Sequence, residues 1–171
     1  DGPAKTMFGH RQLDWLKQAL LAAPREGIKI VAGGSQFWKR AGPHEGWHRY
    51  ATERRAFADW LIAEKIEGVV FLSGDRHFGE LLKIERPNAY PLHEFTSSPL
   101  TSRPQARLDK ADRDNPDVVP GTQVAKRQFG LIRVTGPGDD RRIAFESYDG
   151  AGALLWRREL RANDLRFHFR S

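Results

Sequence analysis

The stretch VVFLSGDRHFGEL, Val69 to Leu81, joins a short apolar run to a turn that carries an aspartate, an arginine and a histidine. The run VVFLS is apolar and too short for a helix, which is typical of a buried strand. Ligands of open α/β sheets bind beyond the carboxyl ends of the strands. Asp75 and His77 stand two positions apart, so both side chains can face one cleft in an extended turn. They could be metal ligands, an acid/base pair, or the rim of a capped turn.

The segments before this stretch alternate between helical and strand patterns. Apolar residues recur at spacings of three and four from Gly9 to Ala23, which predicts an amphipathic helix that Pro24 ends. The run IKIVAGG, Ile28 to Gly34, indicates a buried strand, and a second helix is expected from Ala51 to Gly68 with Thr52 as a candidate cap. Near-continuous apolar strands between helices favour a sheet covered on both faces by helices.

The pattern changes after Glu80. Apolar and polar residues alternate more, and a long polar loop runs from Arg103 to Arg127. Loops of this length usually form functional lids or mobile segments. Three further apolar runs follow, FGLIRVT, RRIAFESY and ALLWRREL, and the turn sequences TGPGDD and DGAG separate them, which predicts an antiparallel meander. The expected fold class is therefore α/β, a helix-strand-helix-strand unit followed by a meander.

Composition limits the classes of protein to consider. The chain has 171 residues, the size of one ordinary domain, and no apolar run long enough to span a membrane. It has no cysteine, which leaves His, Asp, Glu, Asn and Gln as metal ligands. A formal net charge of +6 keeps one alternative open, a non-enzymatic basic module that binds nucleic acid or another anionic polymer. No nucleic-acid-binding motif supports that alternative.

A second strand end carries further polar candidates. Gly33 and Gly34 permit close approach of the backbone to a ligand, and the Gln36 amide that follows could bind a metal or a phosphate oxygen. The glycines could equally do no more than make the turn. The aromatic residues of the next loop either line a substrate pocket or pin the loop to the helices; the candidate substrate-binding residues are Trp38, Trp47 and Tyr50.

Several other kinds of site are not expected. His44 and His48 lie in a loop without a helix to hold their spacing, so they do not predict a second metal site. Ser97 and Ser98 lack the G-x-S-x-G elbow of a serine hydrolase. Neither a P-loop nor a dinucleotide-binding fingerprint follows any predicted strand.

Six separated stretches resemble one family, the PhoD-type alkaline phosphatases (alkaline phosphatase D), a branch of the calcineurin-like metallophosphoesterases. They follow the family's order and are spread over nearly the whole length of the chain. They are KTMFGHRQLDWL (5–16), GSQFW (34–38), EGWHRYATER (45–54), SGDRHFGEL (73–81), HEFTSSPLTS (93–102) and FGLIRV with its DG turn.

The resemblance implies a four-layer αββα metallophosphoesterase sandwich around a two-metal site that hydrolyses phosphate esters, as an alkaline phosphatase or phosphodiesterase. By similarity, Asp75 and His77 would be metal ligands and Arg76 would lie near the phosphate. Gln36 would be a catalytic site residue, with Ser35 where the family usually has Asn. Water activated by the ions, rather than a side chain, is the nucleophile that such a site implies.

The resemblance also implies what this chain does not contain. A two-metal site needs more ligands than the two candidates found, and the family's early ligand motifs would precede Lys5. Residues 1–171 would then be the C-terminal half of a single catalytic domain that needs its N-terminal half as a partner, and the isolated chain would be inactive. The family suggests iron and calcium as the ions, whereas the residue types equally allow Mn, Zn or Mg. Export to the periplasm or medium is implied by the resemblance alone.

Overall fold

The apolar runs on either side of the first loop form two adjacent parallel strands, β1 (Lys29–Ala32) and β2 (Val69–Ser73). On the other side of β2 lies β4 (Ala89–Thr96), also parallel to it, and β3 (Glu80–Arg86) pairs antiparallel with β4 at the edge. The order of this larger sheet is β1-β2-β4-β3. Because β1, β2 and β4 run in the same direction, the loops after all three meet at one edge of the sheet.

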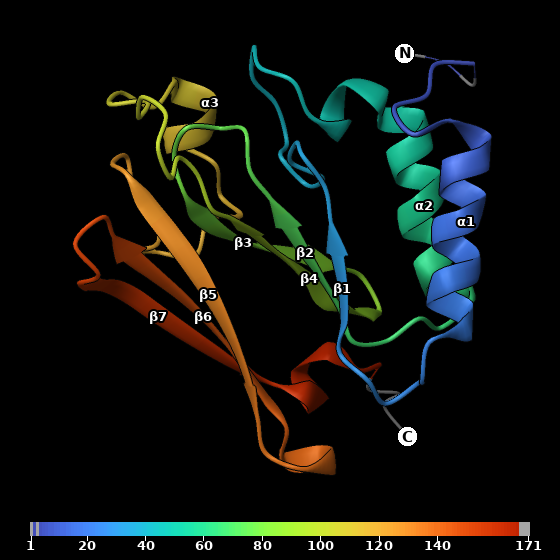
Figure 1. The fold of residues 1–171 in the computed structure, drawn as a ribbon. Coiled ribbons are helices and arrows are strands. Elements are labelled where there is room, and N and C mark those ends of the chain that lie inside the picture. Colours follow the sequence, from blue (N-terminus) through green and yellow to red (C-terminus); the bar gives the residue numbers. More distant parts are fainter. Residues whose placement is uncertain (1, 3, 168–171) are drawn as a thin grey trace.

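The two long helices of the computed structural model, which describes residues 2 and 4–167, lie side by side along one face of this sheet (Figure 1). Helix α1 (Gly9–Ala22) is one residue shorter than predicted. Helix α2 (Ala51–Ala63) follows a short 3₁₀ turn, η1 (Trp47–Tyr50), and ends before the expected Gly68 because Lys65 already has a left-handed φ of 52°. The cap position of α2 is Tyr50 rather than Thr52.

The opposite face of the larger sheet is covered by a second sheet, so the expectation of helices on both faces was wrong (Figure 1). This sheet confirms the predicted antiparallel meander, with the order β5-β6-β7. Its strands are β5 (Gln128–Thr135), β6 (Arg142–Asp149) and β7 (Leu154–Arg161), followed by a 3₁₀ turn, η3 (Ala162–Leu165). The ring of Phe95 on β4 contacts Phe145 and Trp156, with ring centroids 5.7 and 5.3 Å apart. Aromatic packing therefore supplies the cover that a second helical layer was expected to give.

The long polar loop is tied along β3 rather than standing free as a lid. It contains one short helix, α3 (Lys110–Arg113), and isolated bridges join Val124 to Gly79 and Val118 to Leu82. The hydroxyl of Thr122 accepts from the backbone N–H of Leu81 at 3.1 Å. Among all the residues that the structure describes, no helix is long and apolar enough to cross a lipid bilayer.

The packing between the two sheets predicts that Phe95→Ala destabilises the chain strongly. Phe95 is 3% exposed and its ring fills the space between the sheets, so truncation is expected to lower the free energy of unfolding by about 3–5 kcal/mol. Urea unfolding of the purified chain measures this change. Leu154→Ala is the control, because Leu154 is 53% exposed and its loss is expected to cost less than about 0.5 kcal/mol. Equal losses in the two variants would contradict the assigned packing.

Candidate active site at the carboxyl edge of the larger sheet

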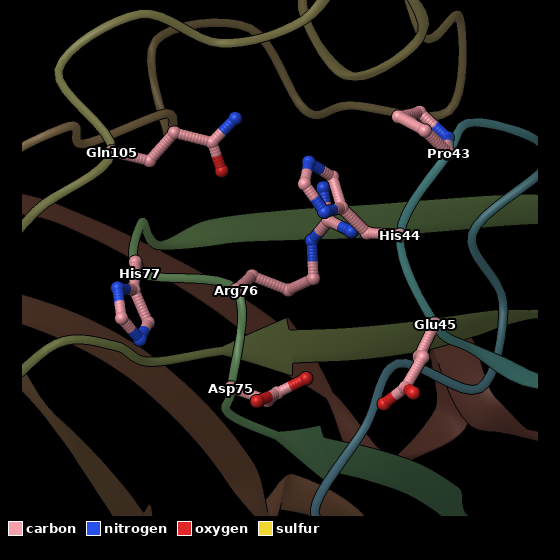
Figure 2. A pocket seen from close by; sticks show the side chains of 7 residues that line it. All are labelled: Pro43, His44, Glu45, Asp75, Arg76, His77 and Gln105. Atoms are coloured by element: carbon pink, nitrogen blue, oxygen red, sulfur yellow. The ribbon is translucent and has the colours of Figure 1, made fainter.

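A pocket of about 630 Å³ opens where the loops after β1 and β2 face the loop that carries α3 (Figure 2). It is lined by Pro43, His44, Glu45, Asp75, Arg76, His77 and Gln105. The structure thus brings three of the predicted site residues, those of the Asp-Arg-His turn, to one hollow. Carboxylate, imidazole, amide and guanidinium groups all border it, which gives the pocket both metal-binding and anion-binding chemistry.

The Asp-Arg-His turn places alternate side chains at different depths. Asp75 and His77 are exposed in the pocket, whereas Arg76 between them is 4% exposed. Asp75 and His77 both have a left-handed backbone, with φ of 63° and 58°. Such conformations cost about 1 kcal/mol or more each for residues other than glycine and gather at functional sites. The turn is fixed by the His77 carbonyl, which accepts from the Gln105 N–H at 2.8 Å.

The described residues offer metal-ligand types but no complete metal site. No three His, Asp or Glu side chains within residues 2 and 4–167 are grouped so that they could hold one ion. Asp75 and His77 carry the donor types that suit a hard or borderline cation, and both are open to the pocket. Their donor set therefore fits part of a metal site.

Gln36 lies beneath the pocket and does not line it, which corrects the expectation that its amide donates to a substrate oxygen. Its side chain is fully buried, and Nε2 donates to Oε1 of Glu80 at 2.8 Å and to Oγ1 of Thr96 at 2.9 Å. Thr96 in turn lies 2.9 Å from the Ser73 hydroxyl. This chain of hydrogen bonds joins the loop after β1 to strands β2, β3 and β4. Gln36 thus supports the edge of the sheet rather than the chemistry at its surface.

Glu80 is a carboxyl group of this network with a raised pKa. It is 1% exposed, and burial raises its pKa from an ordinary value of 4.5 to about 7, although hydrogen bonds from Gln123 and Gln36 favour the ionised form. The loss of water outweighs two donors because ionised carboxylates are strongly disfavoured in a low-dielectric interior. The folded chain therefore keeps a proton on Glu80 over a pH range in which the unfolded chain has released it.

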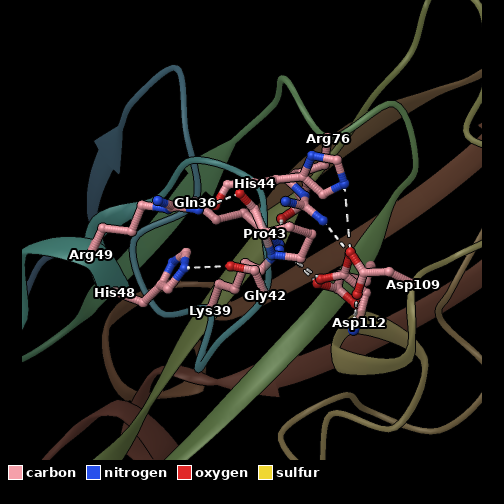
Figure 3. Close-up of polar contacts among 12 residues, drawn as sticks. Gln36, Lys39, Gly42, Pro43, His44, His48, Arg49, Arg76, Asp109 and Asp112 are labelled. Carbon is pink, nitrogen blue, oxygen red and sulfur yellow. Dashed lines mark hydrogen bonds and ion pairs between the residues drawn. The ribbon is translucent and has the colours of Figure 1, made fainter.

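A buried group of three charged residues, which we call the charge triad, is formed by Lys39, Arg76 and Asp112 (Figure 3). Nζ of Lys39 lies 3.0 Å from Oδ1 of Asp112, and Nη2 of Arg76 donates to Oδ2 of the same carboxylate. All three side chains are 2% exposed. Sequence reasoning missed Lys39 and Asp112, because Asp112 sits in a run of acids and bases, LDKADRDNPD, that reads as a solvated loop.

The aromatic candidates lie mainly in the core, which corrects the predicted substrate role of Trp38 and Trp47. Trp47 is fully buried against Phe8 and Phe57, and its indole N–H donates to Glu53 at 2.8 Å. Trp38 packs against Trp47 and is 7% exposed. The rings instead pin the loop after β1 to the helices, which was the second of the two interpretations offered for these aromatic residues. Tyr50 is half-buried, lies outside the pocket lining, and has the Lys5 ammonium 4.8 Å from its ring centre.

Comparisons with known proteins give one family. The family model for PhoD-like phosphatases matches residues 1–140. A solved structure described as the structure of PhoD matches with a TM-score of 0.61 and 18% sequence identity, over 92% of this chain and 36% of that one. The chain thus spans about a third of the length of that structure. No curated protein sequence matches significantly.

The buried carboxyl of Glu80 predicts a pH dependence of stability. Because the pKa is about 7 in the folded chain and 4.5 ordinarily, the free energy of unfolding is expected to fall by about 3 kcal/mol as pH rises through this window. Glu80→Gln cannot ionise, so the variant should gain stability over the native chain at pH 8 relative to pH 5. Urea unfolding at both pH values measures the gain. Glu85→Gln, at an exposed position, serves as the control and should leave the pH dependence unchanged.

The left-handed backbone at Asp75 predicts a difference between two substitutions that both remove its carboxylate. Asp75→Gly relieves the strain at φ 63°, whereas Asp75→Ala retains a Cβ there. We expect the glycine variant to unfold with a free energy about 1 kcal/mol higher than the alanine variant. Thermal and urea unfolding of the pair provide the measurement. Indistinguishable stabilities would show that the turn stores no strain at this residue.

Proposed function

The chain belongs to the PhoD-like phosphatase family, and from this premise we propose that it forms part of an enzyme that hydrolyses phosphate esters at a two-metal site. The observation that carries the proposal is the pocket at the carboxyl edge, where a carboxylate, an imidazole and a guanidinium from one turn border the same hollow. Hydrolysis of a phosphate ester needs groups that hold metal ions and groups that neutralise phosphoryl oxygens. The Asp-Arg-His turn provides candidates for both.

Each residue of the turn has a separate role in this proposal. Asp75 and His77 would hold a metal ion through a carboxylate oxygen and an imidazole nitrogen. Arg76 would donate to phosphoryl oxygens and neutralise charge that develops on them. Iron and calcium are the ions that the family resemblance suggests, and Mn, Zn or Mg would also suit these donors. When bound, two ions would supply an activated water and neutralise the phosphoryl group.

The remaining ligands would come from another part of the same catalytic domain. We assign residues 1–171 to the C-terminal part of a four-layer αββα sandwich, of which the helical layer and both sheets are described. The match to 36% of the PhoD structure supports the view that this chain is one part of a larger fold. Exposed apolar side chains also remain on the outer strands: Ile30 on β1 and Leu131, Val134 and Leu154 on the smaller sheet. Isolated residues 1–171 would then be inactive, and the whole enzyme would be exported, as the resemblance suggests.

The alternative of a basic polymer-binding module is not favoured. The family match points to a phosphatase, and part of the positive charge is already paired within the fold. Arg133 and Arg157, for example, both bind the carboxylate of Glu146, at 2.9 and 2.8 Å.

The proposal predicts loss of both metal and activity when the turn is altered. In the full-length protein, Asp75→Asn and His77→Ala are expected to lower metal content and to slow hydrolysis of a chromogenic phosphodiester about 10- to 100-fold or more. Elemental analysis and initial rates measure the two effects on the same samples. His10→Ala, on the exposed side of α1, is the matched control. Native metal content and native rates in both altered proteins would refute the assignment.

A further inference from the structure

The charge triad beneath the pocket holds two cations on a single carboxylate. Lys39 comes from the loop after β1, Arg76 from the turn after β2, and Asp112 from α3. Each side chain is 2% exposed, so none of the three charges is screened by bulk water. Breaking such a pair leaves an uncompensated buried charge, which is strongly destabilising. The three loops are thus locked together at this point, and two positive charges share one negative charge, which leaves the triad with a net charge of +1.

The guanidinium of Arg76 has donors left over. Its Nη2 binds Asp112, but Nε and Nη1 are buried and have no hydrogen-bond partner among the described residues. A buried donor without a partner has lost its hydrogen bonds to water without replacement, and native structures keep few of them. The ring of Phe78 lies 5.3 Å from the guanidinium carbon and covers one side of the group. Its orientation is therefore fixed while two of its nitrogens remain unused.

Beside these donors lies a half-exposed side chain, that of His44. Arg76 borders the pocket from below, and the His44 imidazole lies beside its guanidinium in both close views (Figures 2 and 3). The His44 side chain is 52% exposed, and Nε2 lies 3.5 Å from Oδ2 of Asp109. A half-exposed contact of this kind is weak because water screens it. Displacing the imidazole would open the Arg76 donors to a ligand in the pocket.

We propose that Asp112 and Lys39 are positioning residues that complete a receptor for the phosphoryl group. Arg76, which the proposed function already assigns to the phosphoryl oxygens, donates to them through Nε and Nη1, the donors left free by Asp112. Asp112 holds the guanidinium by Nη2, and Lys39 offsets the charge of Asp112 so that the receptor stays cationic. A phosphate oxygen would satisfy donors that the protein leaves unpaired, and planar guanidinium groups match phosphate geometry well. The inference rests on the proposed function for its substrate class, but binding through Arg76 does not require a metal ion.

The test is a titration of the full-length protein with inorganic phosphate by isothermal calorimetry in the presence of EDTA. Arg76→Lys retains the positive charge but replaces the planar fork of guanidinium donors with a single ammonium group, and is expected to weaken phosphate binding at least about tenfold. Asp112→Asn is expected to weaken it to a similar extent, and Asp112→Glu to restore part of the affinity. The matched control is Asp114→Asn, whose side chain is 49% exposed and pairs with the adjacent Arg113.

Several outcomes would overturn the receptor. It is wrong if the native protein binds no phosphate, or if Arg76→Lys binds it with native affinity. Circular dichroism and thermal unfolding check that each variant folds, and Arg76→Lys decides the question should Asp112→Asn fail to fold. Native phosphate affinity in a folded Asp112→Asn would remove the positioning role of Asp112.

Metal-loaded protein separates this inference from the proposed function. Asp112→Asn is expected to raise KM for the chromogenic phosphodiester and the inhibition constant of phosphate while metal content stays native. A variant of Asp75 should instead lose metal. Hydrolysis without any phosphate binding to the metal-free protein would leave the proposed function standing and refute the receptor. Phosphate binding that depends on Arg76, in a protein without hydrolytic activity, would support the receptor and refute the proposed function.

Discussion

Parallel pairing of β2 with both β1 and β4 is the constraint on which the site depends. The register places Ala32 beside Leu72, and Ser73 beside Thr96, so three strands end at nearly the same level. Loops far apart in sequence must then leave the sheet at one edge. A slip of the β1 register would carry the first loop away from the turn at Asp75 and would divide the pocket. Strand pairing thus determines where the pocket lies, and the side chains of the loops determine its chemistry.

Buried polar contacts then hold these loops in place. The carboxylate of Glu94, fully buried on β4, accepts from the backbone N–H groups of Phe37 and Trp38 at 2.8 and 2.7 Å. Burial raises the pKa of Glu94, while these donors favour its ionised form. Glu94 thus anchors the loop after β1 to the sheet, and Asp112 anchors the α3 loop to Lys39 and Arg76. Carboxylates placed under the pocket therefore serve as anchors, each at the cost of its own desolvation.

Local patterns predicted the elements but not their tertiary partners. The spacing of Leu13 and Leu20 indicated α1, and turn residues such as those after Asp149 indicated the meander, because both signals lie within a few residues. Which layer covers each face depends on contacts such as Phe95 with Trp156, which no local period encodes. The alternation at Asp75 and His77 was readable for the same reason that α1 was, since it depends on neighbours in the chain.

The charge triad could not be read from the sequence, since its members lie in three separate loops. Nothing local distinguishes Asp112 from Asp109 or Asp114, which share its charged surroundings; only the fold buries one and exposes another. On the proposed function, the alternation along the Asp-Arg-His turn then has a physical purpose. A ligand for a cation has to be reachable from the pocket, whereas a donor to phosphate gains strength from exclusion of water. Placing His77 at the surface and Arg76 below it meets both demands with consecutive residues, and the left-handed backbone is the strain that this arrangement imposes.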